Sequence, residues 1–304
     1  MHSTAKARIS SPRTSFPRAS FGRSTFAFLM LSLATTRLAA TPASAPPQRI
    51  VALGGAITET LYALGEEQKI VGVDTTSLYP PDALRAKPNV GYFRAFSAEG
   101  VLSLKPTLVI AASAAGPEDS IKLLEESKVA VARLPDNFTA EGVESKITTL
   151  GHLTGTDAKA ATLAKTVAQG FAQLATLRAK VHERAHVLFI IAMQGGRPLV
   201  AGTGTAADAV IALAGGVNVA QGFAGYKQMS DESIVAAQPD VVVMMANGKP
   251  PAPGEIFSLP AFKTTPAAAH GRLVALDGLY LLGFGPRTPQ AAKDLFAAFY
   301  PGLK

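Results

Sequence analysis

The stretch TDAKAATLAKTVAQGFAQLATLRAKVHER, residues 156–184, decides how the rest of this 304-residue chain is organised. It contains no proline, and at ~1.5 Å per residue it predicts one helix about 40 Å long. An apolar stripe with spacings of three and four supports the helix, at Leu163, Val167, Phe171, Leu174 and Leu177. An ordinary long helix inside a single domain is the alternative to a helix that joins two domains.

Short apolar runs alternate with helical patterns before this stretch. Strands are predicted at residues 49–55, 69–74, 106–112 and 129–135, and helices at about 57–64, 98–104, 117–127 and 140–153. Strands that alternate with helices indicate a parallel sheet covered on both faces.

The same alternation returns after the long helix. Strands are predicted at 186–192, 240–245 and 272–277, and helices at 206–214, 230–237 and 289–299. The fold class is therefore α/β, with two Rossmann-like lobes joined by a single long α-helix. The expected divisions are residues 46–155, 156–184 and 185–304, and a ligand would bind in the cleft between the lobes.

A short pattern occurs once in each predicted lobe. Ser97-Ala98-Glu99 precedes one helix and apolar strand, and Ser230-Asp231-Glu232 precedes another. A serine can cap a helix, and an acid in the first turn interacts favourably with the helix N-terminus, which alone would explain both glutamates. The repetition suggests two lobes related by pseudo-symmetry.

Residues 1–45 have the order of a secretory signal peptide: a basic segment, the apolar run TFAFLMLSLA and small residues. Cleavage is expected after Ala43 or Ala45, which places the mature protein in the periplasm as a soluble chain. Without the six basic residues that precede Ala45, 23 basic residues face 22 acidic ones, so charge does not indicate a nucleic-acid surface. The chain contains no cysteine, which excludes disulfides, thiolate metal sites and a lipid anchor on an N-terminal cysteine.

Catalytic motifs are absent from the sequence. We find no Gly-x-Ser-x-Gly elbow, Walker loop or His-Glu-x-x-His motif. The glycine-rich GTGTAADA, residues 202–209, can cradle an anionic group but lacks a nucleotide-binding spacing. The histidines are dispersed and do not suggest a metal site: His152, His182, His186 and His270. An enzyme with a Rossmann-like fold is the alternative from a different class.

Tyr92 and Arg94 lie on a short link before a predicted helix and a buried strand. A phenolate is a hard anionic donor that suits ferric iron, and tyrosine is a known axial haem ligand. In an extended segment, side chains two positions apart point to the same side, so Arg94 can assist the phenolate or pair with a ligand carboxylate. A half-buried tyrosine beside an ordinary surface arginine explains the same residues.

Six motifs in order resemble the periplasmic haem-binding proteins of ABC-type haem importers. They are RIVALGGAITETLYALG (49–65), VGVDTTSLYP (71–80), VGYFRAFSAEGVLSLKPTLVI (90–110), GTGTAADAVIALAGGVN (202–218), GYKQMSDESIVAAQPDVVVM (225–244) and LLGFGPRTPQAA (281–292). The resemblance covers the chain from about Arg49 to the C-terminus. It implies the class III periplasmic binding protein fold, with two α/β lobes bridged by one helix.

The resemblance also implies roles for seven residues. Tyr92 matches the iron ligand, and the expected haem contacts are Arg94, Tyr226, Lys227 and Arg287. The expected docking residues for the permease are Glu99 and Glu232. Some relatives offer a histidine from the second lobe, where this chain has Met193 and Gln194, so a second protein ligand and the number of haems stay open.

The resemblance implies a monomeric carrier that is not an enzyme. It would bind haem as its transported ligand and deliver it to an inner-membrane ABC permease and its ATPase. A carrier of the same fold for a ferric siderophore or for cobalamin is the alternative.

Overall fold

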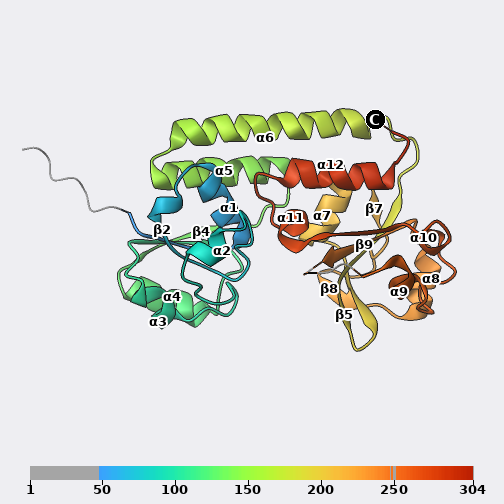
Figure 1. The fold of residues 1–304 in the computed structure, drawn as a ribbon, viewed down its shortest axis with the longest axis horizontal. Helices are drawn as coiled ribbons and strands as arrows, with labels where there is room; N and C mark the ends of the chain where they lie inside the picture. The colour runs from blue at the N-terminus through green and yellow to red at the C-terminus, as the bar shows by residue number, and fades with distance from the viewer. Residues whose placement is uncertain (1–47, 247, 249–250, 304) are drawn as a thin grey trace, which may run out of the picture. The chain divides into compact units, whose positions relative to one another are not determined.

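The computed structural model describes residues 48–246, 248 and 251–303. The predicted signal peptide and its cleavage point lie outside these residues. Within the described part, two α/β lobes are joined through helix α6 (Asp157–Arg178), and Figure 1 shows them in blue to green and in yellow to red. The predicted fold class is confirmed.

The first lobe contains a four-stranded parallel sheet in the order β2-β1-β3-β4. Its strands are β1 (Ile50–Leu53), β2 (Ile70–Val73), β3 (Leu108–Ala112) and β4 (Ala130–Leu134). Every residue of β1 is buried, as expected of a central parallel strand that is covered on both faces. The helices of this lobe are α1 (Gly55–Ala63), η1 (Glu67–Lys69), α2 (Ala83–Ala86), α3 (Ala98–Ser103), α4 (Glu118–Glu126) and α5 (Ala140–Thr154).

The second lobe contains a six-stranded mixed sheet in the order β10-β9-β5-β6-β8, with β7 paired to β5. Its strands are β5 (His186–Gln194), β6 (Arg197–Ala201), β7 (Val217–Asn218), β8 (Tyr226–Gln228), β9 (Val241–Ala246) and β10 (Leu273–Asp277). Strands β5 and β6 form an antiparallel hairpin that the sequence pattern missed. Gly195 and Gly196 both have positive φ, as the two central residues of a type I′ hairpin turn require.

The described residues of the second lobe also form the helices α7 (Ala206–Leu213), α8 (Asp231–Ala237), α9 (Pro253–Phe257), α10 (Pro266–Ala269), α11 (Gly278–Leu282) and α12 (Thr288–Phe299). The sequence predicted α7, α8 and α12. The short helices α9, α10 and α11 were not predicted, because four or five residues are too few to show a helical period.

The long helix is shorter than predicted. It ends at Arg178 and not at Arg184, because Lys180 and Val181 donate to carbonyls three residues back and tighten the last turn. Helix α6 lies along α5 and contacts α12, as Figure 1 shows. The α5–α6 approach depends on Gly151, since a Cβ there would lie 2.2 Å from the Cβ of Ala160.

One apolar core continues through both lobes on the side of α6. It includes Ile50 and Ile110 from the first sheet, Val167 and Phe171 from α6, and Phe296 from α12. The other face of each sheet has a separate core. Because the shared core is close-packed, it restrains how the two lobes can move relative to each other. None of the described helices is both long and apolar enough to cross a membrane.

Candidate functional site

The segment that carries Tyr92 is held from both sides at the end of the first sheet. Thr75 donates its backbone N–H to the Gly91 carbonyl at 2.9 Å, and Gly116 donates to the Phe93 carbonyl at 2.9 Å. Gly91 has φ near +95°, a conformation that favours glycine. These bonds fix the segment beside the loops that follow β2 and β3, the strand ends where α/β sheets usually bind ligands.

Tyr92 is 44% exposed, which is unusual for a large aromatic side chain. Its ring meets the edge of the Phe93 ring at a centroid distance of 5.0 Å. The segment is a turn and not an extended strand, because Ala95 donates to the Tyr92 carbonyl at 2.7 Å. The expectation that Tyr92 and Arg94 share one side of an extended segment is therefore wrong. Arg94 instead lies over the Phe93 ring, 5.2 Å from its centroid.

Tyr226 and Lys227 lie on strand β8, which pairs with β6 at the edge of the second sheet. Tyr226 is 37% exposed. Burial of its inner part raises the pKa of its hydroxyl, while the charge of Arg94 and a hydrogen bond with Thr205 lower that pKa. Lys227 lies over the Phe223 ring at 5.5 Å, in the same way that Arg94 lies over Phe93.

The charge of Arg94 lowers the pKa of Tyr226, so these two residues lie within electrostatic range of each other. Arg94 belongs to the first lobe and Tyr226 to the second, more than 130 positions away along the chain. Each lobe thus presents an exposed tyrosine next to a cation that is held over a phenylalanine ring. Exposed aromatic rings and cations suit a flat, apolar ligand with anionic groups.

Two residues beside this site were not singled out from the sequence. Leu78 and Tyr79 are 45% and 40% exposed, on the loop that bonds to Gly91 through Thr75. The sequence pattern that could have indicated them is an apolar pair, Leu-Tyr, in a loop that contains two prolines. Exposed apolar side chains on a loop that is hydrogen-bonded to the Tyr92 segment indicate a surface made for contact.

Arg287 has strong partners within the protein. Its Nη2 donates to the Glu59 Oε2 at 2.8 Å, and its backbone N–H donates to the Oε1 at 3.1 Å. The guanidinium lies 3.6 Å from the centroid of the Tyr79 ring. Glu59 is buried, and it is not among the residues that were expected at the site. The structure therefore gives Arg287 a contact between the lobes, and its role as a haem contact stays a prediction.

Glu99 and Glu232 occupy equivalent positions in the first turns of α3 and α8. Ser97 and Ser230 cap the two helices as predicted, each accepting a backbone N–H through its hydroxyl. The pKa of Glu99 lies below its usual value because Ser97 donates to the carboxylate at 2.8 Å. Hydrogen bonds from its own backbone and from Ser230 lower the pKa of Glu232. Both carboxylates are exposed and ionised at neutral pH.

The glycine-rich GTGTAADA segment has little capacity for an anion. The backbone N–H groups of Gly202, Thr203 and Gly204 already donate to Gly225, Phe223 and the Asp208 carboxylate, respectively. Within the described residues no three His, Asp or Glu side chains gather as a metal site would require.

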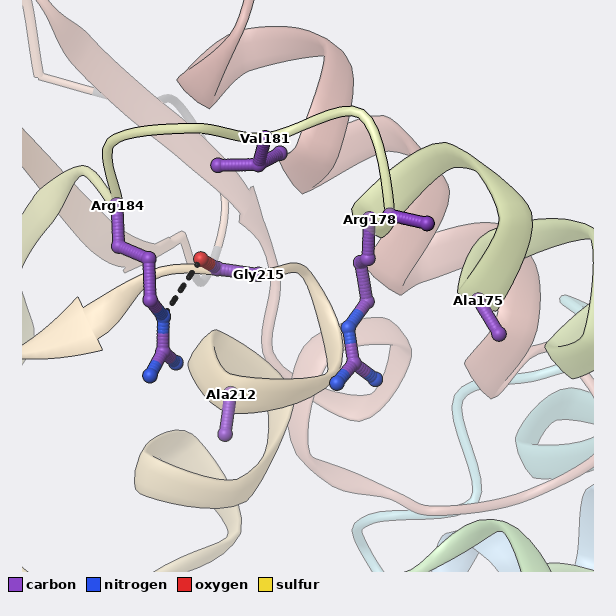
Figure 2. Close-up of a pocket in the computed structure, with 7 residues that line it drawn as sticks. Ala175, Arg178, Val181, Arg184, Ala212 and Gly215 are labelled. Carbon is purple, nitrogen blue, oxygen red and sulfur yellow. Dashed lines mark hydrogen bonds between the residues drawn. The ribbon is translucent and has the colours of Figure 1, made fainter.

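A pocket of about 490 Å³ lies away from Tyr92, at the C-terminal ends of α6 and α7. Figure 2 shows Arg178 and Arg184 at this pocket, with Arg184 donating to the Gly215 carbonyl at 3.2 Å. Arg184 also donates to the Gly216 carbonyl. Cations at the C-termini of helices satisfy the last carbonyls and complement the helix dipole, so a structural role accounts for Arg184.

Comparison with solved structures gives strong matches over most of the chain. The periplasmic heme-binding protein RhuT from Roseiflexus sp. RS-1 is 39% identical, with a TM-score of 0.79 over 84% of this chain and 99% of that one. A periplasmic heme-binding protein from Pseudomonas aeruginosa is 38% identical, with a TM-score of 0.78 over 85% and 95%.

Curated relatives are more distant. An uncharacterized ABC transporter substrate-binding lipoprotein of Bacillus subtilis, YvrC, is 28% identical and covers 84% of this chain and 81% of its own length. A cobalamin-binding protein of Halobacterium salinarum is also 28% identical, over 84% and 70%.

The family model described as "Periplasmic binding protein" matches residues 50–279, which include the first lobe, α6 and most of the second lobe. This match and the solved relatives confirm the family that the six motifs indicated. The chain belongs to the periplasmic binding protein family.

Proposed function

We propose that this protein binds haem between its lobes and delivers it to an ABC permease and its ATPase in the inner membrane. The main observation in support of this proposal is the 39% identity to a heme-binding protein over 99% of that chain. The family is one of substrate-binding transport proteins, and we propose that this member carries its ligand without a catalytic step.

Tyr92 is the proposed iron ligand. Its exposed phenol stands on a segment that backbone hydrogen bonds fix from two sides, so little ordering is needed when the ligand binds. Iron would bind the phenolate oxygen of Tyr92, a hard anionic donor of the kind that serves as an axial haem ligand. Arg94, Lys227 and Tyr226 would then contact the haem and its carboxylates.

Titration of the purified protein with ferric haem tests this proposal. We expect saturable binding with a shifted Soret band and the absorption of a tyrosinate-ligated ferric haem. Cobalamin and a ferric siderophore are the comparison ligands, since a relative of similar extent is named as cobalamin-binding. Tighter binding of either comparison ligand than of haem would reject the assignment.

Glu99 and Glu232 are the proposed docking residues for the permease. Both are exposed, ionised and similarly placed, one in each lobe, as a contact with two arginines of a partner would require. The test is haem uptake by the reconstituted permease with the double variant Glu99→Ala and Glu232→Ala.

A matched control separates docking from helix stability. Glu141 and Glu255 are also exposed acids in first helical turns, one in each lobe. We expect uptake to fall in the Glu99→Ala/Glu232→Ala protein while haem affinity is unchanged, and to persist in the Glu141→Ala/Glu255→Ala protein. Equal uptake by both double variants would contradict the docking role.

We further propose that the mature protein is a periplasmic monomer without a lipid anchor. The signal-peptide pattern supports export, and the 304 residues contain no cysteine that could be lipidated. Cell fractionation and light scattering test these two points. Membrane-bound material or a stable dimer would overturn them.

A further inference from the structure

A segment of the second lobe, residues 279–287, packs against the first lobe. We call these residues, together with Glu59, Tyr79 and Lys146, the cross-lobe joint. Lys146 Nζ donates to the Phe284 carbonyl at 3.0 Å, and the Phe284 ring lies 5.1 Å from that of Phe138. The contact is close, since a Cβ on Gly285 would lie 3.2 Å from the Glu59 Oε1.

Glu59 is the central polar residue of the cross-lobe joint. Only 4% of its surface is exposed, and its two oxygens accept from the side chain and the backbone N–H of Arg287. Arg287 is the residue immediately before α12, so an acid of the first lobe lies at the N-terminus of a helix of the second. That position favours a negative charge.

Arg287 depends on Glu59 for its charge partner. Its Nε is buried and has no hydrogen-bond acceptor among the residues that the structure describes. The Glu59 side chain is 5% exposed and that of Arg287 27%, so removal of the Glu59 carboxylate would leave the Arg287 charge partly buried and uncompensated, which is unfavourable. In a protein without the Glu59 carboxylate, any arrangement of the lobes that exposed Arg287 to solvent would therefore be stabilised.

Arg287 also connects the joint to the candidate ligand site. Its guanidinium lies 3.6 Å from the Tyr79 ring centroid and 5.1 Å from that of Tyr280, whose hydroxyl donates to Asp294 at 2.7 Å. Tyr79 is 40% exposed, on the loop that bonds to the Tyr92 segment. Contacts thus lead from Glu59 through Arg287 to Tyr79, and the loop that carries Tyr79 is hydrogen-bonded to the Tyr92 segment through Thr75 and Gly91.

We propose that Glu59 is a positioning residue that acts through Arg287 and Tyr79 to set the orientation between the ligand-binding surfaces of the two lobes. The proposal rests on the proposed function for its ligand. It does not require Glu59 to touch that ligand, since the carboxylate is buried in the joint. Ligand affinity would depend on Glu59 because only one lobe orientation brings Tyr92 and Tyr226 to the same molecule.

The test variant is Glu59→Gln, which keeps the size of the side chain and removes its charge. Glu66→Gln is the matched control, because Glu66 is an equally buried acid whose ion pair with Lys69 lies within the first lobe. The chain has no cysteine, so spin labels can be placed on α4 and α9 through Lys122→Cys and Glu255→Cys. Their distance distribution is measured without ligand, and ferric haem is then titrated into unlabelled protein.

We expect Glu59→Gln to broaden the label distance distribution, with the absorption spectrum of the bound haem unchanged. If it lowers the population of the binding orientation to about a tenth, haem affinity falls about tenfold. Glu66→Gln should match wild type in both measurements. Distances and affinity in Glu59→Gln that equal those of the control would overturn the proposal.

A second variant covers the case in which Glu59→Gln does not fold. Arg287→Lys keeps the charge but loses the planar group that stacks on Tyr79, and it should broaden the distances in the same way. Unchanged distances in this variant would also overturn the proposal. Failure of the wild type to bind haem would instead count against the proposed function, because the label distances do not depend on haem.

Discussion

Substitutions of two tyrosines should have opposite effects on haem binding and stability. One should reduce haem affinity and leave stability nearly unchanged, and the other should reduce stability and leave haem affinity unchanged. Tyr92 and Tyr300 are each changed to phenylalanine, which removes one hydroxyl and keeps the ring. No hydrogen bond of the Tyr92 hydroxyl is present among the residues that the structure describes, and the ring is 44% exposed. Tyr300 Oη donates to the Gly215 carbonyl at 2.8 Å and accepts from the Ala185 N–H at 3.1 Å.

The structure sets the expected size of each effect. An exposed substitution such as Tyr92→Phe should change stability by no more than about 0.5 kcal/mol. Tyr300→Phe leaves the buried Ala185 N–H without its acceptor, which costs about 1–3 kcal/mol. For a domain of this size, about 2 kcal/mol lowers the melting temperature by roughly 4–8 °C.

Haem affinity should show the reverse order. Loss of a group that only supports a metal ligand typically costs about 10–100-fold in affinity, so loss of the ligand itself in Tyr92→Phe should exceed about 100-fold. Tyr300→Phe should bind haem as the wild type does, because its hydroxyl lies in the packing near Gly215.

Thermal melts of the apo proteins and haem titrations followed at the Soret band provide both measurements. Wild-type affinity and an unchanged spectrum in Tyr92→Phe would refute the assignment of the iron ligand. A fall in melting temperature of Tyr92→Phe as large as that of Tyr300→Phe would show that the loss of binding reflects unfolding.

Three further predictions follow from single contacts. Gly55→Ala should destabilise the protein by about 1–3 kcal/mol in urea unfolding, because its Cβ would lie 2.2 Å from the Thr76 carbonyl oxygen; an unchanged midpoint would contradict this. Burial lowers the pKa of Lys146, so the unfolded chain binds more protons and stability should rise as pH increases towards the ordinary value of 10.5. Lys146→Met should abolish that rise, and a persistent rise would assign it to other groups. Arg94→Ala should weaken haem binding less than Tyr92→Phe does. It should also raise the pKa of Tyr226 in an ultraviolet titration, since the arginine charge lowers that pKa in the wild type. An unchanged pKa would show that Arg94 does not influence Tyr226.

The regular elements were largely predictable because their signals are local. The run Ile50–Leu53 is buried on both faces, and the caps at Ser97 and Ser230 depend on residues within one turn. The apolar stripe along α6 was predictable for the same reason, although the end of the helix at Arg178 was not. That end depends on where the chain must turn into β5, which the helical period does not encode.

The candidate site was predictable in its residue types and less so in its geometry. Tyr92 stands out in a chain without cysteine or tryptophan. Its segment, however, is a turn, because hydrogen bonds to two neighbouring loops decide its backbone. Strand β8, which carries Tyr226, was missed since three exposed residues at a sheet edge show no alternation of polar and apolar side chains.

The sequence by itself determined the α/β class and the two lobes with one long helix between them, and it predicted the site residues that are proposed above to bind haem. These properties follow from period, composition and motif order, which are local or read along the chain. Only the tertiary structure decided which distant residues meet. The pairing of Glu59 with Arg287 joins residues 228 positions apart, and Lys146 reaches the Phe284 carbonyl across 138 positions. Such contacts depend on how the two lobes pack around α6, and no local pattern along the chain specifies that packing.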